Sequence, residues 1–214
     1  MFSIASFTFS PIAENTYLLH NETGDCIIID PGCYFGNERE TLQDYIEKHA
    51  LRPKYLLNTH CHLDHVFGNK FVHDTWQLEL YIHPKEQPVL AFAAEAGVQW
   101  GMPFSNYEGP LHFLREGEQI RLGNDVLNVL FAPGHSPGHI CFYCAAQNFV
   151  IDGDVLFRQS IGRTDLPGGN HETLLNSIRN VLFTLPDDTV LYPGHGATTT
   201  VGFEKKHNPF LRMP

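Results

Sequence analysis

The sequence predicts an α/β (α+β) chain in which two β-sheets pack face to face with helices on the outside. Strand-like runs come in two batches, and each batch is accompanied by its own helices. The 214 residues, 43% hydrophobic and 18% charged, are enough for one domain with a substantial core, and no repeat or linker divides them. We therefore expect a single domain over residues 1–214.

The first batch of strands is predicted to be a meander that leads into a helix and a short buried strand. Asn21 and Gly24 give the second connection the composition of a hairpin turn. The helix is expected to have Asn37 as its N-cap, with Glu40 three residues further on. The expected strands are 2–9, 15–20, 25–30 and 54–58, and the expected helix is 37–50.

The rest of the chain is predicted to have two more helices, a long loop and then the second batch of strands. The loop, 98–117, is rich in Gly, Pro and aromatic residues; Trp100, Phe104 and Tyr107 either line a substrate cleft or anchor it. The expected helices are 66–76, 84–97 and 172–184, and the expected strands are 119–122, 126–131, 139–144, 148–151 and 189–192.

Potential metal ligands follow four of these strands within a few residues. Strand ends of packed sheets converge at one edge, so side chains that follow them can meet in space. The candidates are His60, His62, Asp64 and His65 after the strand 54–58, and then His135, Asp154 and His195 after three later strands.

The spacing of the first run suits metal binding. Residues i and i+2 of an extended segment point the same way, so His60 and His62 can bind one ion together. Asp64 and His65 lie where the chain turns into a helix and can serve an adjacent position. A carboxylate such as Asp154 has two oxygens and can bridge two ions. Isolated histidines elsewhere are interpreted as ordinary core or helix-end residues.

The motifs together resemble the metallo-β-lactamase fold, a four-layer αββα sandwich of two mixed sheets. Thr59-His-Cys-His-Leu-Asp-His65 resembles its HxHxDH signature, and GHSPGH, DGD and PGHG match its later ligand motifs in order. The resemblance implies that His60, His62 and His135 hold one ion, that Asp64, His65 and His195 hold another, and that Asp154 bridges them. Asp30, in Asp-Pro-Gly, would orient a ligand histidine, although a simple turn-forming role is the alternative.

Within this fold the chain is most similar to the short form of the glyoxalase II-like group. Ser160-Ile-Gly-Arg-Thr-Asp165 and His207-Asn-Pro-Phe210 carry that similarity. The full-length group has an additional C-terminal helical region, which does not follow His195 here. The lysine and tyrosine that contact glutathione in that group correspond to Arg163 and Asp165 here. Arg163 therefore keeps the positive charge, and it either binds a substrate anion or pairs with Asp165. True β-lactamases usually have a cysteine where Asp154 stands, which argues against that activity.

The reaction implied is hydrolysis of a thioester by a hydroxide shared between two divalent ions. Zinc is the favoured metal, with iron or manganese as alternatives. Two ions bring +4 and the hydroxide −1, and Asp64 and Asp154, which we take as the catalytic carboxylates, bring −2. The net charge near +1 favours a small anionic substrate. A thiolate leaves without a dedicated general acid, and Asp64 is expected to orient the nucleophile.

Other functions remain open. A persulfide dioxygenase with one iron shares this fold and the Gly162-Arg-Thr-Asp165 segment. A lactonase and a non-catalytic metal-binding protein are weaker alternatives. The acyl group, the thiol, the physiological metal and the oligomeric state are not predicted.

Composition excludes some partners. The net charge is −10 and Lys and Arg do not cluster, which argues against nucleic acid. No apolar run is long enough for a membrane span or shaped like a signal peptide. Five scattered cysteines favour reduced thiols and a cytoplasmic protein, with Cys61 and the Cys141–Cys144 pair as ordinary buried residues.

Overall fold

The computed structural model describes residues 1–211, which divide into two compact units. The first unit contains Met1–Leu114 and Arg121–Asp125, and the second contains Arg115–Ile120 and the chain from Val126 onward. Two mixed six-stranded sheets form their frameworks, with a small two-stranded sheet besides. The predicted class of two sheets with their own helices is confirmed.

The first sheet has the strand order β1-β2-β3-β4-β5-β6. β1, β2 and β3 are antiparallel neighbours, whereas β3, β4, β5 and β6 run parallel to one another. The bounds are Ser3–Phe9 (β1), Glu14–His20 (β2), Asp25–Ile29 (β3), Arg52–Leu57 (β4), Leu80–Ile82 (β5) and Leu111–Phe113 (β6).

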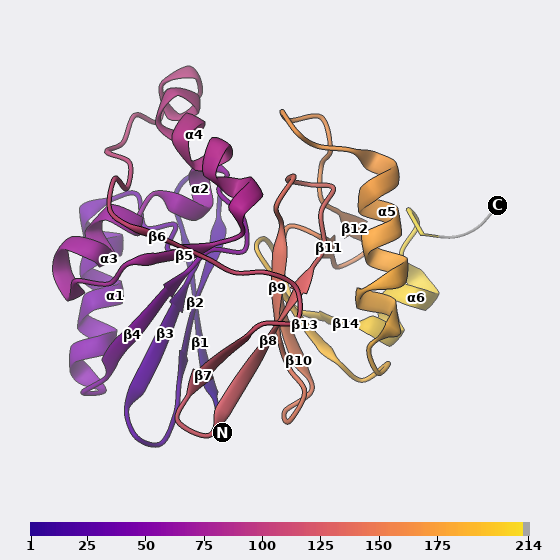
Figure 1. The fold of residues 1–214 in the computed structure, drawn as a ribbon, viewed down its shortest axis with the longest axis horizontal. Coiled ribbons are helices and arrows are strands. Elements are labelled where there is room, and N and C mark those ends of the chain that lie inside the picture. The colour runs from indigo at the N-terminus through magenta and orange to yellow at the C-terminus, as the bar shows by residue number, and fades with distance from the viewer. Residues whose placement is uncertain (212–214) are drawn as a thin grey trace. The chain divides into compact units, whose positions relative to one another are not determined.

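Helices α1 and α3 lie on one face of this sheet (Figure 1). Leu42 and Ile46 of α1 are buried with Ile28 and Leu56 of the sheet, and each such side chain contributes about 1.5–3 kcal/mol. The helices of the first unit are Gly36–Lys48 (α1), Leu63–Val66 (α2), Asn69–Trp76 (α3), the 3₁₀ turn Pro84–Glu86 (η1) and Gln87–Gln99 (α4).

The second sheet has the order β14-β13-β10-β9-β8-β7. β10 and β13 are parallel, and the pairs β8–β9, β9–β10 and β13–β14 are antiparallel. The bounds are Gln119–Leu122 (β7), Asp125–Phe131 (β8), Ile140–Cys144 (β9), Phe149–Gly153 (β10), Val190–Pro193 (β13) and Thr199–Thr200 (β14), with Leu156–Phe157 (β11) and Ser160–Ile161 (β12) as a separate hairpin.

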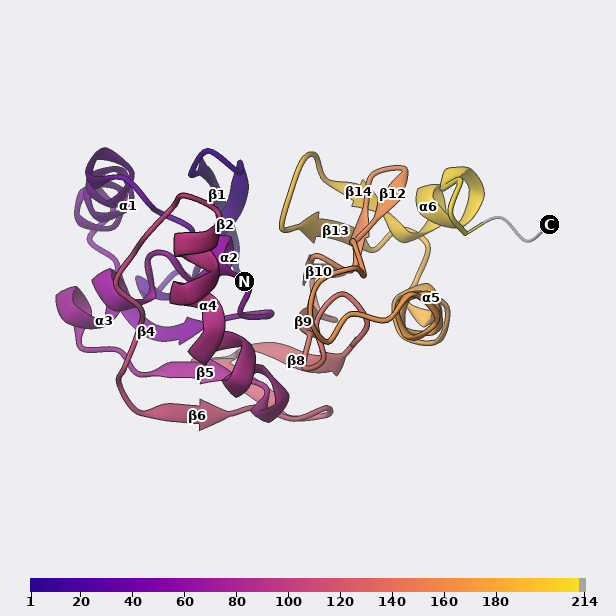
Figure 2. The ribbon, with the colours of Figure 1, turned by 90° about the horizontal axis from the view of Figure 1, so that it is seen from above.

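Helices α5 (His171–Asn180) and α6 (Val201–His207) cover one face of the second sheet, as both views show (Figures 1 and 2). A 3₁₀ turn, Leu182–Thr184 (η2), follows α5. Leu174 and Ile178 of α5 pack against Cys141, Val150 and other buried residues of the sheet. The amphipathic pattern of 172–184 correctly predicts this packing.

Several predicted boundaries are wrong. The predicted helix 66–76 starts too early: Val66 ends the short helix α2, and α3 begins at Asn69, after Gly68, where a side chain would meet the carbonyl of Pro31 at 2.6 Å. Asn37 is not the N-cap of α1: the helix begins at Gly36, and the Glu38 carboxylate accepts the N–H of Phe35 at 2.9 Å. The predicted loop 98–117 contains β6.

Short elements were also missed. β5, β11, β12 and β14 have two or three residues each, and α6 has seven, which is too short for a clear periodic pattern. Within the described residues, every helix is too short or too polar to cross a membrane.

Candidate metal centre

In the first unit, the predicted site residues follow two parallel neighbouring strands. Ile29 at the end of β3 is opposite Leu57 at the end of β4. The carboxyl ends of parallel strands meet at one edge of a sheet, so Asp30 lies beside the segment that carries Thr59 and His60.

Asp30 is held in a network of donors. Its carboxylate is 1% exposed and accepts hydrogen bonds from Asn58 Nδ2 (3.1 Å), the Thr59 N–H (2.7 Å) and Thr59 Oγ1 (2.6 Å). His65 Nδ1 lies 3.0 Å from Asp30 Oδ2. The backbone of Asp30 has φ 50°, a conformation that a short polar residue tolerates at a constrained site. The predicted orienting role therefore fits the geometry better than a plain turn.

This network also fixes the tautomers of two histidines. A carboxylate only accepts, so His65 carries its proton on Nδ1 toward Asp30 and keeps the Nε2 lone pair for a metal. His60 Nδ1 lies 3.1 Å from Thr59 Oγ1, whose own proton goes to Asp30. His60 Nδ1 is therefore the donor, and its Nε2 also presents a lone pair.

Because Asp30 accepts these four bonds, we do not interpret it as a ligand. Its carboxylate oxygen lies in a group with ligand atoms of His60 and His65, all within 4.8 Å of one another. Both oxygens of Asp30 are already bonded to donors, and the His65 contact is made through the nitrogen that bears the proton. Asp30 would therefore act on a bound metal through His65 rather than as a ligand.

The remaining candidate ligands of the first run lie around a tight turn. His62 is half-buried and directly precedes α2, and Asp64 Oδ2 lies 3.8 Å from His65 Nε2. The ring of His60 is 4.8 Å from that of His62 and 4.1 Å from that of His65. Cys61 packs in the apolar core of this unit, as its alternation predicts.

Two buried acidic residues that lie against this run were not predicted from the sequence. Glu86 Oε2 accepts the N–H of Cys61 at 2.8 Å. Glu14 lies 3.9 Å from His65 Nδ1, and burial raises the pKa of the Glu14 carboxyl well above its ordinary value, with the negative charge of Asp30 adding to the effect. Burial and the Glu86 and Asp30 carboxylates raise the pKa of the Cys61 thiol as well, so it stays protonated.

In the second unit, three candidate ligands follow three strands that point the same way. β10 and β13 are parallel, and β8 and β10 are each antiparallel to β9, so all three end at one edge. His135 follows β8, Asp154 follows β10 and His195 follows β13. The side chains of His135 and Asp154 are nearly buried, and that of His195 is 24% exposed.

Asp154 lies within reach of both histidines. Its Oδ2 is 3.4 Å from His135 Nε2 and 3.6 Å from His195 Nε2. Ligand atoms about 2.1 Å from a tetrahedral ion are roughly 3.4 Å apart, so these separations suit ligands of a metal. The position of one carboxylate oxygen between two imidazoles is what a bridging ligand requires.

Backbone groups hold these side chains. His135 Nδ1 donates to the carbonyl of Arg163 at 2.8 Å, so its Nε2 keeps the lone pair. The Asp154 N–H donates to His139 Nε2 at 3.1 Å, which makes the fully buried His139 a supporting residue that was not predicted. The second histidine of GHSPGH was the signal for it.

Gly162 allows this arrangement. A Cβ at Gly162 would lie 1.9 Å from the carbonyl oxygen of Asp154 and 3.1 Å from His135 Nδ1. The segment after β12 therefore lies so close to Asp154 and His135 that only glycine fits at this position.

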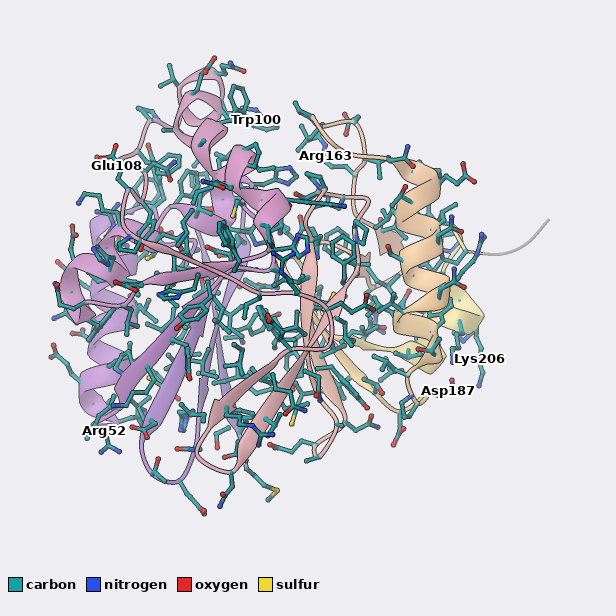
Figure 3. All side chains as sticks on the ribbon, viewed as in Figure 1. Arg52, Trp100, Glu108, Arg163, Asp187 and Lys206 are labelled. Carbon is teal, nitrogen blue, oxygen red and sulfur yellow. The ribbon has the colours of Figure 1, made fainter. Side chains whose placement is uncertain are left out.

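Arg163 forms an ion pair with Asp165. Its Nε and Nη2 donate to the two carboxylate oxygens of Asp165 at 2.7 and 2.8 Å. This bond lowers the pKa of Asp165 to about 2. Both side chains are exposed on the loop that precedes α5, where Figure 3 labels Arg163. Of the two predicted roles, the pairing with Asp165 is the one seen.

A cavity of about 560 Å³ lies elsewhere in the first unit, and none of the predicted ligands lines it. Phe104 and Tyr107 contribute to its wall. The Tyr107 hydroxyl accepts the N–H of Leu80 and donates to the carbonyl of Pro110, so it anchors the loop. Trp100, at the end of α4, is 53% exposed (Figure 3).

Comparisons with known proteins identify the family. Residues 10–195 match the model of the metallo-beta-lactamase superfamily. The chain is 41% identical to the probable metallo-hydrolase YqgX of Bacillus subtilis, over 94% of this chain and 93% of that one. It is 38% identical to the hydroxyacylglutathione hydrolase GloC of Haemophilus influenzae, over 92% of each.

Solved structures agree. The BLEG-1 B3 metallo-beta-lactamase is 37% identical with a TM-score of 0.89, covering 98% of this chain and 99% of that one. The di-iron-bound form of TTHA1623 is 39% identical with a TM-score of 0.88, covering 97% and 100%.

The chain belongs to the metallo-β-lactamase superfamily, and its two mixed sheets with helices have that fold. Within that superfamily it is a metallohydrolase, and the fold implies that it binds divalent metal. The predicted family and fold are thereby confirmed.

Proposed function

We propose that the chain is a dinuclear thioester hydrolase. His60, His62 and His135 would hold one divalent ion, Asp64, His65 and His195 the other, and Asp154 would bridge them. The position of Asp154 Oδ2, 3.4 Å from His135 and 3.6 Å from His195, is the observation that carries this proposal. We further propose that residues 1–214 work as one domain.

The donor set fits such ions. His60, His65 and His135 each engage Nδ1 with an oxygen, which directs the Nε2 lone pair outward. Imidazole and carboxylate ligands favour zinc, although iron and manganese also accept them. When bound, two such ions supply a nucleophile at neutral pH and stabilise the oxyanion that forms on the carbonyl.

The chain's own groups complete the reaction. The Asp64 carboxylate accepts a hydrogen bond from the attacking water and orients it toward the thioester carbonyl. The water oxygen bonds to the carbonyl carbon while its proton passes to the solvent, the C–S bond then breaks, and the thiolate leaves without needing a proton from a general acid. Asp30 keeps His65 in the tautomer that this arrangement needs.

We propose a small anionic thioester as the substrate, of the hydroxyacylglutathione type that the name of the GloC relative states. Arg163 would meet the substrate's carboxylate. Its bond to Asp165 is exposed on both sides, so water screens it and a substrate anion can compete for the guanidinium. The five cysteines are buried thiols, which supports a reducing cytoplasmic setting.

A substrate panel on metal-quantified protein tests this function. S-lactoylglutathione is expected to be hydrolysed faster than unrelated thioesters, a lactone or a β-lactam; the β-lactam is included because of the similarity to BLEG-1. Faster cleavage of the β-lactam or the lactone would replace thioesters as the substrate class. Metal binding without cleavage of any of them would support a non-catalytic role.

A persulfide dioxygenase is the second candidate, favoured by the Gly162-Arg-Thr-Asp165 segment. An oxygen electrode with glutathione persulfide separates the two. Oxygen uptake by protein that holds a single iron would establish the dioxygenase, whereas no uptake supports the hydrolase.

A further inference from the structure

We infer that Glu86 is a positioning residue for the ligand pair His60 and His62, acting through the backbone N–H of Cys61 between them. The inference rests on the proposed function, in which these two histidines hold one ion. It adds a residue outside the family's ligand motifs, from a different part of the chain.

The contact is direct and buried. The Cys61 N–H donates to Glu86 Oε2 at 2.8 Å, and both residues are 0% exposed. β4 has already ended at Leu57, so no β-ladder bond fixes the peptide of Cys61. Because His60 and His62 flank this peptide, its orientation sets the angle between their two imidazoles.

Glu86 is itself well anchored. It is the last residue of η1 and the residue before α4, and its N–H donates to the carbonyl of His83 at 2.9 Å. A carboxylate at the start of a helix is stabilised by the helix dipole. Glu86, which supports the two histidines, is therefore fixed as part of a helix terminus.

The surroundings of Glu86 also bear on its negative charge. A buried carboxylate is costly unless its surroundings compensate it. The Cys61 N–H and the start of α4 contribute to this compensation, and cations bound by His60 and His62 would add to it. A glutamine would keep the hydrogen bond to Cys61 but lose this attraction, whereas an alanine would lose both.

Metal affinity and the spectrum of the cobalt-loaded protein test the inference. Glu86→Ala is expected to weaken Zn²⁺ binding in chelator competition by about 10–100-fold for one of two ions, and to shift the visible bands of bound Co²⁺. Glu86→Gln is expected to show a smaller loss, of about threefold or more. Glu86→Ala with wild-type affinity and an unchanged spectrum would overturn the inference; if that variant does not fold, the same result with Glu86→Leu, which also lacks an acceptor for the Cys61 N–H, would do so.

Glu38→Ala is the matched control. Glu38 also accepts backbone N–H groups in the first unit, from Ser10, Tyr34 and Phe35, but none of these flanks a ligand. It should lower the melting temperature and leave Zn²⁺ affinity and the Co²⁺ spectrum unchanged. An equal loss of affinity in Glu38→Ala would reduce Glu86 to a general structural role.

His60→Ala separates this inference from the function beneath it. If His60→Ala keeps both ions, the ligand assignment fails. If His60→Ala loses an ion while Glu86→Ala and Glu86→Gln lose no affinity, only the role of Glu86 fails.

Discussion

The two units supply their ligands in different ways. In the first unit, four candidate ligands fall within six consecutive residues, and the buried Asp30 bonds to His65 directly and to His60 through Thr59. In the second unit, the three ligands come from three separate strand ends. Backbone groups there play a larger part, through the carbonyl of Arg163 and the close approach of Gly162.

This difference predicts two kinds of sensitivity. Changes to residues that support the run His60–His65 should weaken metal binding only partly, because each removes one hydrogen bond of several. Changes in the second unit should lower metal binding and turnover sharply. One carboxylate, Asp154, lies beside both histidines there, and one backbone segment fixes its position.

The largest effect is expected for Asp154→Ala. A bridging ligand serves both ions, so metal content and thioester turnover should fall together, turnover by about 10³-fold or more. His62→Ala should lose only one of the two bound ions. Elemental analysis and steady-state rates measure both, and an inactive Asp154→Ala protein that retains two ions would contradict the bridging role.

Gly162→Ala should come next. The added methyl group would lie 1.9 Å from the carbonyl oxygen of Asp154, so the bridging ligand or the hairpin must move. A displacement of about 1 Å can cost about 100-fold in rate, which kcat and metal affinity would reveal. Gly36→Ala, where a Cβ meets nothing within 4 Å, is the control and should behave as wild type. Similar kinetics in the two variants would refute the close-approach argument.

Asp30→Asn should have a graded effect. An amide can still accept from Thr59, but its nitrogen side cannot accept the His65 proton, so the tautomer of His65 is no longer fixed. We expect metal affinity to fall by about 10–100-fold, measured by chelator competition. If Asp30→Asn binds both ions as the wild type does, the orienting role is wrong.

The smallest effect is expected at Asp187, on the surface of the second unit. Lys205 donates to its carboxylate at 2.7 Å and lowers the pKa of Asp187, which Figure 3 labels. A lowered pKa in the folded state stabilises the protein above the ordinary pKa of an aspartate, and this stabilisation is lost as the pH falls below it. Asp187→Asn should lower the melting temperature at pH 7 by no more than about 2 °C, and this difference should disappear once the pH is low enough to protonate Asp187 in the folded state. A constant difference across this range would exclude the ion pair as its cause.

The sequence predicts the first half of the site more directly than the second. His60 to His65 are adjacent in the chain, so alternation and spacing alone indicate a metal site there. His135, Asp154 and His195 become convincing only because each follows a strand, and their mutual distances depend on the order of strands in the sheet.

Supporting residues were the hardest to predict. Glu86 is 25 residues from the Cys61 N–H that it accepts, and an acid before a helix is an ordinary N-terminal signal. The short strands β5 and β6 escaped detection for a related reason, since three-residue strands owe their existence to parallel neighbours rather than to local pattern.

The most direct test of the two-metal account is a metal titration of the chelator-treated protein, with hydrolysis of S-lactoylglutathione as the readout. The account predicts that turnover is absent without metal and continues to rise until two equivalents per chain are bound, in parallel with metal content. Full turnover at one equivalent, with no further gain from the second, would contradict it.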